Sequence, residues 1–346
     1  MTAIEQWSSQ FGSQYDARFA AFSACPYNMR IASLLKSAHV RTFADTNSLD
    51  VPDQIFERDG VDIREMQKIA LSQIDYNTVI PPMPSVIEKI DSVLSTPDVS
   101  FKEVAEVVAL DAALATKVLQ LINSSMYAVK REIATIEQAV SLMGIQHVRN
   151  LTLAVSVVST FKSNSVVGLD LKRFWDHSMA VALGSRALAT VERDRGNKEI
   201  DPEEAFLAGL VHDVGRVVIA SNYHEEQKLI EQLVNENRDS YLHAELSALG
   251  FRHTELGHEL TKTWMLSPAI QSAVLYHHEP KSHGLFPAIV SAADTLAYGL
   301  GFYTYCDKVQ ASDPSIWAEL DLSDQVIEQV AIRMLQQFEA VQEMVA

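Results

Sequence analysis

Apolar residues recur at helical spacing along most of the chain that follows residue 80. One such stripe ends before Pro97 and consists of Val86, Ile87, Ile90, Val93 and Leu94. Residues three or four positions apart share one face of an α-helix, so this spacing predicts an amphipathic helix. No sustained alternation with a period of two is present. The pattern therefore predicts an all-α fold.

Several expected helices also carry end signals. Ser100–Glu103 and Thr135–Gln138 each match a capping box, in which the first and fourth residues satisfy free backbone N–H groups. Asp201 and Pro202 supply an N-cap and a proline at the first helical position. From there we expect one buried helix, with apolar residues at 206, 207, 210, 211 and 214, that closes on Gly215.

Three prolines at positions 81, 82 and 84 interrupt the helical pattern, because proline cannot lie inside a helix. We therefore expect an N-terminal helical extension over residues 1–79, a main helical domain over residues 80–305 and a C-terminal helical segment over residues 306–346. The apolar face of the last helix, around residues 326–341, needs a partner, which is either the main domain or a second chain.

Composition narrows the class of protein. The formal net charge of −17 argues against direct binding to nucleic acid or to an anionic membrane surface. No apolar run is long enough to span a membrane, and residues 1–10 lack the features of a signal peptide. The two cysteines, Cys25 and Cys306, form neither a metal motif nor a disulfide framework. A cytoplasmic protein fits these features.

His212 and Asp213 lie side by side within an apolar run. A buried carboxylate is costly unless it is paired or bound to a metal. One interpretation is a hydrogen-bonded pair at a helix end. The other is a pair of ligands to a divalent cation, because imidazole and carboxylate suit Mg, Mn, Fe or Zn.

Other histidines and one further aspartate lie on otherwise apolar helical segments: His177, His253, His277, His278 and Asp294. Each residue alone could be an ordinary hydrogen-bonded core or surface residue. Ligands on facing helices are, however, how all-α proteins build metal sites. The set as a whole is therefore a candidate metal centre.

Taken in chain order, these residues resemble the ligand pattern of the HD superfamily of metal-dependent phosphohydrolases. The resemblance implies a first ion bound by His177, His212, Asp213 and Asp294. It implies a second ion bound by Asp213, His253, His277 and His278. In an active member, a hydroxide that bridges the two ions beside Asp213 would attack a phosphoester.

The surrounding sequence resembles one branch of that superfamily, the HDOD domain. The motifs that carry this resemblance are Pro82-Met83-Pro84, the Asp111–Ser124 segment, the Ile136–Gly144 segment, Phe174–Ser178 and Glu245 ahead of His253–Gly257. The resemblance covers residues 80–294 and implies a helical bundle. It also implies a bacterial signal-transduction module that usually lacks demonstrated hydrolase activity.

The chain also departs from the catalytic relatives at several positions, and these differences favour a signal-transduction module over a hydrolase. Hydrolases of the HD-GYP type have Lys where this chain has Arg216, and a planar guanidinium does not replace a compact ammonium. Their HHExxDGxGYP signature is only echoed by residues 277–287, and Arg173 stands where some members have a supporting Glu. Arg216 and Glu279 are expected to lie beside the ligands without binding metal.

The sequence therefore predicts a regulatory HDOD module, without catalytic activity, that binds a protein partner or a small ligand such as a nucleotide. It is expected to retain one or two divalent ions, with Fe, Mn, Mg and Zn as candidates. The alternative is a metal-dependent phosphohydrolase acting on a nucleotide or another phosphate ester. Self-association into a homo-oligomer is left open.

Overall fold

The fold is all-α, as the apolar pattern predicts. A computed structural model of the 346-residue chain describes residues 67, 70–96, 99–127, 129–162, 166–237, 240–302, 304, 316 and 319–345. Within these ranges every regular element is a helix. The expectation for residues 1–79 falls mostly outside the described residues.

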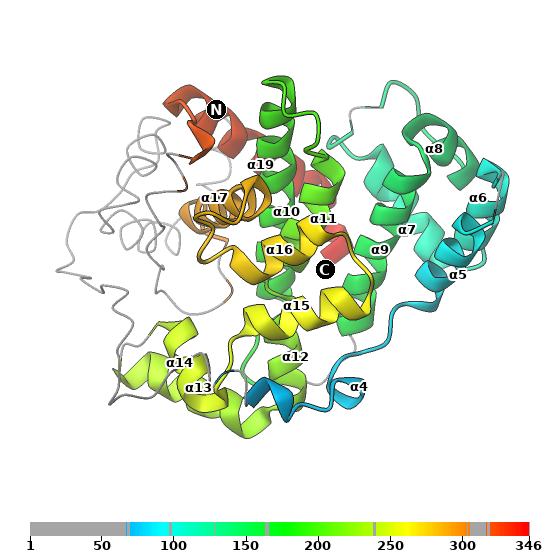
Figure 1. The fold of residues 1–346 in the computed structure, drawn as a ribbon. Coiled ribbons are helices and arrows are strands. Elements are labelled where there is room, and N and C mark those ends of the chain that lie inside the picture. Colours follow the sequence, from blue (N-terminus) through cyan, green and yellow to red (C-terminus); the bar gives the residue numbers. More distant parts are fainter. Residues whose placement is uncertain are drawn as a thin grey trace.

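The N-terminal lobe consists of short helices around one long one. They are α5 (Ser85–Leu94), α6 (Phe101–Ala109), α7 (Ala112–Asn123), α8 (Ile136–Met143) and α9 (Ile145–Lys162). The single-turn helix α4 (Tyr76–Val79) precedes them and lies beside α12 (Val214–Asn222; Figure 1), where the Asn222 side chain donates to the carbonyl of Val79. Ser100 and Glu103 make the full capping box that the sequence predicts. The second predicted box forms only in part: Thr135 accepts from the backbone N–H of Gln138, but the Gln138 side chain accepts from the N–H of Ala134 and not from that of Thr135. Figure 1 places α5, α6, α7 and α8 to one side of the molecule, with α9 facing its centre.

The remaining helices form the main bundle. They are α10 (Leu171–Asp194), α11 (Pro202–Val211), α12 (Val214–Asn222), α13 (His224–Asn237), α14 (Tyr241–Leu249), α15 (His253–Thr263), α16 (Pro268–Tyr276), α17 (Leu285–Gly299) and α19 (Asp324–Val345). Helix α10 is the central element, since it packs against α11, α17 and α19. Helices α15 and α16 continue this core from α12 to α17.

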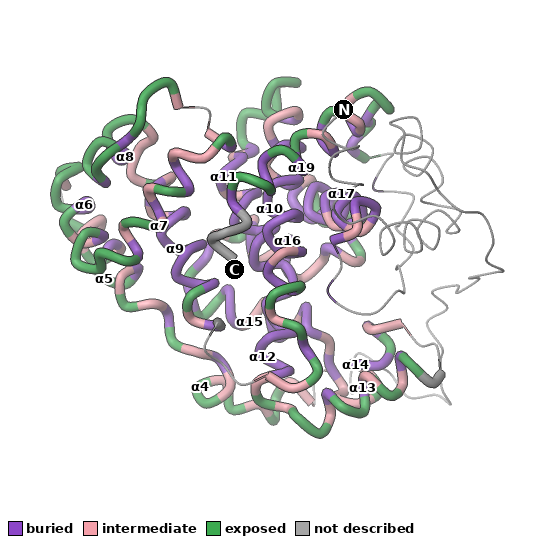
Figure 2. Tube along the Cα trace, turned by 180° about the vertical axis from the view of Figure 1, so that it is seen from behind, coloured by how far each residue is buried: buried purple, intermediate pink, exposed green. Residues whose placement is uncertain are grey.

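The central helices of the bundle are the most buried ones. Figure 2 shows α10 and α11 as largely buried, whereas α5, α6, α8 and α13 expose one face. Both Trp175 on α10 and Trp264, which caps α15, pack against Phe161 near the end of α9. These aromatic contacts join the N-terminal lobe to the bundle in one hydrophobic core.

The C-terminal helix α19 finds its partner within the same chain. Its apolar side packs on α10, where the Met334 side chain reaches Gly184. The Phe338 ring lies 4.5 Å from that of Phe302, which follows α17. The main domain therefore covers the face that the sequence left open to either the domain or a second chain. The domain boundaries expected near residues 80 and 305 remain predictions.

One expected helix is two helices in the structure. Helix α11 ends at Val211, His212 is its C-cap, and Asp213 is the N-cap of α12 with φ −102° and ψ 9°. Gly215 lies inside α12 and does not terminate a helix, so the expectation of one helix closing at Gly215 is wrong. The apolar spacing continues across the break because both short helices are buried on all sides.

Glu203 is not simply a first-turn acid that faces solvent. Its position in the first turn of α11 suits the helix dipole, but its side chain is buried. The Tyr127 hydroxyl donates to Glu203 at 2.5 Å and the Arg186 Nε donates to it at 2.6 Å. Arg186 also donates to the carbonyl of Met126. Glu203 thus ties the segment after α7 to the bundle, whereas Glu204 is half-buried.

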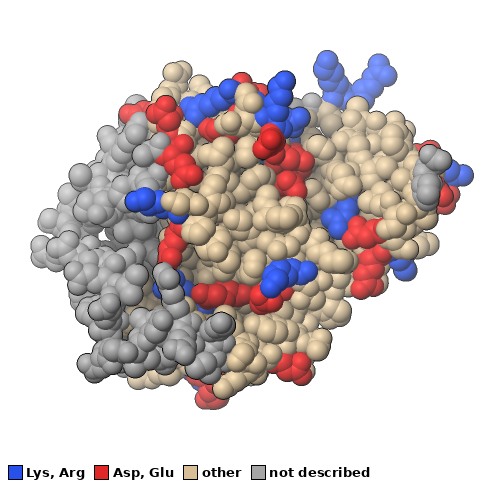
Figure 3. All heavy atoms as spheres, viewed as in Figure 1, with Lys and Arg blue, Asp and Glu red and all other residues tan. Residues whose placement is uncertain are grey.

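Surface charge is mixed. On the face shown in Figure 3, Lys and Arg side chains lie among Asp and Glu side chains across several helices. None of the helices within the described residues is long and apolar enough to cross a membrane.

Candidate metal centre

Every residue predicted to bind metal lies at the centre of the bundle. His177 is on α10, Asp294 on α17, and His212 and Asp213 form the junction between α11 and α12. His253 is the first residue of α15, and His277 and His278 follow α16 directly. His278 and Asp294 are half-buried, and the other five are buried.

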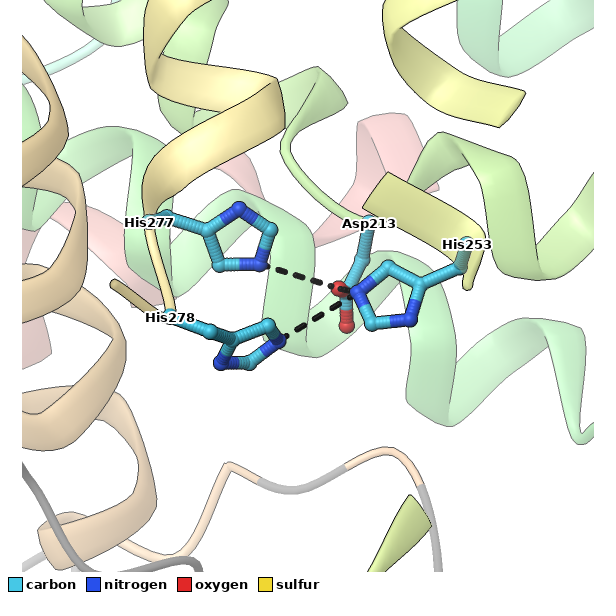
Figure 4. A group of neighbouring side chains, drawn as sticks. All are labelled: Asp213, His253, His277 and His278. Atoms are coloured by element: carbon cyan, nitrogen blue, oxygen red, sulfur yellow. Dashed lines mark hydrogen bonds and ion pairs between the residues drawn. The ribbon is translucent and has the colours of Figure 1, made fainter. Parts of the chain in front are cut away.

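These residues form two groups whose donor atoms lie within 4.8 Å of one another. The four-donor group consists of Asp213, His253, His277 and His278 (Figure 4). The three-donor group consists of His177, His212 and Asp294. The division matches the two ligand sets that the HD resemblance implies, apart from the sharing of Asp213. That these residues bind metal remains a prediction.

Asp213 lies between the two groups, and its oxygens face different neighbours. Oδ1 lies 2.9 Å from the Nε2 of His253 and 3.5 Å from that of His277. Oδ2 lies 3.6 Å from the Nε2 of His212, which is too long for a hydrogen bond. His212 instead donates through Nδ1 to the carbonyl of Gly209 at 2.8 Å. The geometry does not support a simple hydrogen-bonded His–Asp pair.

The histidine rings are oriented by hydrogen bonds on the nitrogen remote from the centre. The Nδ1 of His177 donates to the carbonyl of Phe302, and that of His277 donates to the carbonyl of Val274. The Nδ1 of His253 donates to the Glu245 carboxylate at 2.7 Å. A proton on Nδ1 leaves the lone pair on Nε2, and Nε2 is the atom that faces the centre. Such remote partners are typical of metal-binding histidines.

The shortage of hydrogen-bond partners among the donor atoms also suits a divalent cation. His277 Nε2 is buried and makes no hydrogen bond, and the buried Asp213 Oδ1 and Asp294 Oδ1 contact only ring nitrogens, those of His253 at 2.9 Å and His177 at 3.2 Å. Buried polar atoms normally have a partner. In the four-donor group, the Nε2 atoms of His253 and His278 also lie 3.3 Å apart. A cation between these atoms would satisfy them, and this mixture of imidazole and carboxylate suits Zn, Fe or Mn.

Electrostatics favour the metal-binding forms of His212, Asp213 and His278, whereas neighbouring carboxylates raise the pKa of His177 and of His253 despite their burial. Burial lowers the pKa of His212 to about 4, so its imidazole is neutral at pH 7. Burial would raise the pKa of Asp213, but Arg216, His212 and His253 together hold it well below its ordinary value. Burial likewise lowers the pKa of His278. Neutral imidazole and ionised carboxylate are the forms that bind metal.

The two residues expected beside the ligands have different positions. Arg216 is buried, and its Nε lies 2.9 Å from Asp213 Oδ2. Glu279 points to the surface and pairs with Arg252 at 2.9 Å, so it does not contact the ligand groups. Arg173 is exposed and pairs with Asp170.

Glu245 is the residue that the sequence-based site assignment omitted. It lies on α14, is buried and accepts from both the backbone N–H and the Nδ1–H of His253. The proximity of His253 and Arg216 keeps its pKa below the ordinary value despite burial. A glutamate in an apolar helix eight residues before a candidate ligand was the available signal.

Glu245→Gln is expected to weaken binding of a divalent ion by about 10–100-fold, because a neutral amide orients His253 but no longer raises the basicity of its ring. Competition with a chromogenic chelator would measure the change. Glu259→Gln is the matched control on α15 and should leave the affinity unchanged, because the half-buried Glu259 pairs with Lys262 and not with a candidate ligand. Equal affinities for the Glu245 variant and the unmodified protein would contradict this role.

The fold and the site together define a helical domain of the HD type. The sequence model of the HDOD domain matches residues 80–280, more than half of the chain. The chain therefore belongs to the HDOD domain family.

Three comparisons illustrate its relatives. An uncharacterized protein of Treponema pallidum (strain Nichols) is 27% identical over 213 residues, which are 61% of this chain and 40% of that protein. A proposed phosphohydrolase from Shewanella amazonensis SB2B superposes with a TM-score of 0.64 at 24% identity, covering 80% of this chain and 98% of that one. A proposed signal-transduction protein from Marinobacter aquaeolei VT8 superposes with a TM-score of 0.62 at 20% identity, covering 82% of this chain and 65% of that one. These structural likenesses establish the fold alone.

Proposed function

We propose that this protein is a regulatory HDOD module of a signal-transduction system that holds divalent metal at the centre of its bundle and does not hydrolyse phosphoesters. Its output would be the binding of a protein partner or of a small ligand such as a nucleotide. The observation that carries the proposal is the buried ion pair between Arg216 and Asp213, at the carboxylate that both ligand groups would share.

Two-metal hydrolysis depends on that carboxylate. Two ions about 4 Å apart stabilise the attacking and leaving oxygens, and a bridging ligand holds them at this separation. In this chain the Asp213 oxygen nearest to the three-donor group faces a guanidinium. Arg216 is therefore a physical obstacle to a bridged pair of ions. The metal would then stabilise the bundle by joining helices α12, α15 and α16.

A phosphohydrolase is the second candidate, and one observation favours it. All seven residues of the two-ion ligand pattern converge on one place in the bundle. If Arg216 moved when ions bound, the two groups could act together. This candidate requires turnover that depends on metal, which the regulatory proposal excludes.

Metal analysis combined with activity assays distinguishes the two candidates. The purified full chain is expected to contain bound divalent metal. With added Mn or Fe it should hydrolyse bis(p-nitrophenyl) phosphate, nucleotides and cyclic-di-GMP no faster than Asp213→Ala does. Metal-dependent turnover above that background would overturn the regulatory proposal in favour of the hydrolase. Metal-free protein that also fails to bind added Zn, Mn or Fe would overturn the metal centre.

A further inference from the structure

We propose that Arg216 restricts this centre to one divalent ion, bound by the four-donor group. This inference rests on the proposed metal centre and goes beyond it, because it states how many ions bind, where they bind and which residue decides. The HD ligand pattern by itself implies two ions.

The first argument is the asymmetry of Asp213. Its Oδ1 lies 2.9 Å from His253 Nε2 and 3.5 Å from His277 Nε2, so this oxygen points at the other donors of the four-donor group. Its Oδ2, the oxygen nearest to His212, lies 2.9 Å from the Arg216 Nε. The three-donor group would need Oδ2 as its fourth ligand. The guanidinium occupies the side of Asp213 from which that second ion would be bound.

The second argument is that Arg216 is a fixed part of the core. It is buried and lies one turn after Asp213 on α12, a spacing that brings the two side chains together. Its guanidinium carbon lies 5.2 Å from the centre of the Tyr241 ring on α14, within the range of a cation–π contact. Arginine keeps its charge at any relevant pH. Displacing it would break a buried ion pair and this aromatic contact.

The third argument is the number of donors. The four-donor group supplies three imidazoles and one carboxylate oxygen, which complete the four-coordinate shell typical of zinc. The three-donor group supplies only His177, His212 and Asp294 once Oδ2 is committed to Arg216. An ion there would lack a protein ligand and would lie close to a permanent positive charge.

Native mass spectrometry and elemental analysis of the full chain test the proposal, with Zn, Mn or Fe(II) supplied at saturation. We expect one ion per chain in the unmodified protein. His278→Ala should lose the ion, because His278 belongs to the four-donor group. His177→Ala should retain it, because His177 belongs to the three-donor group. Arg216→Ala should bind a second ion, and Arg216→Lys, whose smaller head can withdraw from Oδ2, is the companion variant if the alanine variant does not fold.

Two ions in the unmodified protein would overturn the inference, and so would an ion lost in His177→Ala but kept in His278→Ala. An Arg216→Lys variant that folds and still binds one ion would also overturn the role of Arg216. These failures differ from failure of the proposed function, which would show as a protein without any ion or with metal-dependent turnover.

Discussion

Asp213→Ala is expected to lower the free energy of unfolding of the metal-free protein by about 3 kcal/mol. Removing one member of a buried ion pair typically costs about 3–5 kcal/mol, because the remaining charge stays buried without its partner. Here the remaining charge is that of Arg216. The nearby Glu245 carboxylate, whose pKa this guanidinium helps to depress, offsets part of the loss. We therefore expect a value at the lower end of that range.

Urea unfolding followed by circular dichroism, with chelator in every sample, would measure this loss. Asp176→Ala is the matched control, because Asp176 forms a largely exposed pair with Lys172. Such a pair contributes at most about 1 kcal/mol. The double variant Asp213→Ala with Arg216→Met removes both buried charges and should recover most of the loss. If the single Asp213 variant unfolds at the same urea concentration as the unmodified protein, the buried pair does not have the assigned role.

Gly215→Ala is expected to destabilise the protein by about 3 kcal/mol and to reduce its metal content. A Cβ atom at Gly215 would lie far inside van der Waals contact with the carbonyl oxygen of His253. It would also lie 2.8 Å from the carbonyl carbon of His253 and 2.9 Å from the Gly257 nitrogen. All three are backbone atoms, so rotation of a side chain cannot relieve the overlap. Overpacking of this kind costs about 1–3 kcal/mol, and a backbone clash should fall at the upper end.

The same clash explains the expected loss of metal. Helix α15 would have to move away from α12, and His253, as its first residue, would move with it. Gly257→Ala is the matched control in the same helix contact. Its nearest neighbour would be a side-chain methyl of Val274 at 3.0 Å, which can shift by a few tenths of an ångström. Thermal unfolding and metal analysis of both variants would test the contrast. A Gly215 variant as stable and as metal-rich as the Gly257 variant would contradict it.

Local signals were sufficient for the helices and their ends. The Ser100 capping box and the Asp201–Pro202 start form as predicted, and of the predicted Thr135 capping box only the N-cap hydrogen bond forms. These signals depend on residues within four positions of one another, so no knowledge of the tertiary structure is needed to read them. Among the described residues, the apolar spacing misplaces a helix end between Val211 and Val214, where two largely buried helices meet and neither has a polar face to mark its end.

The candidate ligands could be predicted because an ionisable residue in an apolar helix is conspicuous. The pattern of seven such residues also matched the HD order. Glu245 and Glu203 were harder to interpret, because a glutamate in a helix is ordinarily a surface residue. Their roles depend on partners far along the chain, such as Tyr127 and Arg186 for Glu203. Glu279 shows the opposite case, since its position beside two histidines did not bring it to the centre.

The sequence by itself determined that the chain is helical, where most helices begin and which residue types could bind metal. The physical reason is that helix periodicity, capping and ligand chemistry are local properties. Only the tertiary structure decided that α19 packs within its own chain and that Arg216 faces one oxygen of Asp213. Those outcomes depend on how separate helices pack, and a difference of a few ångströms there separates a bridging ligand from a buried ion pair.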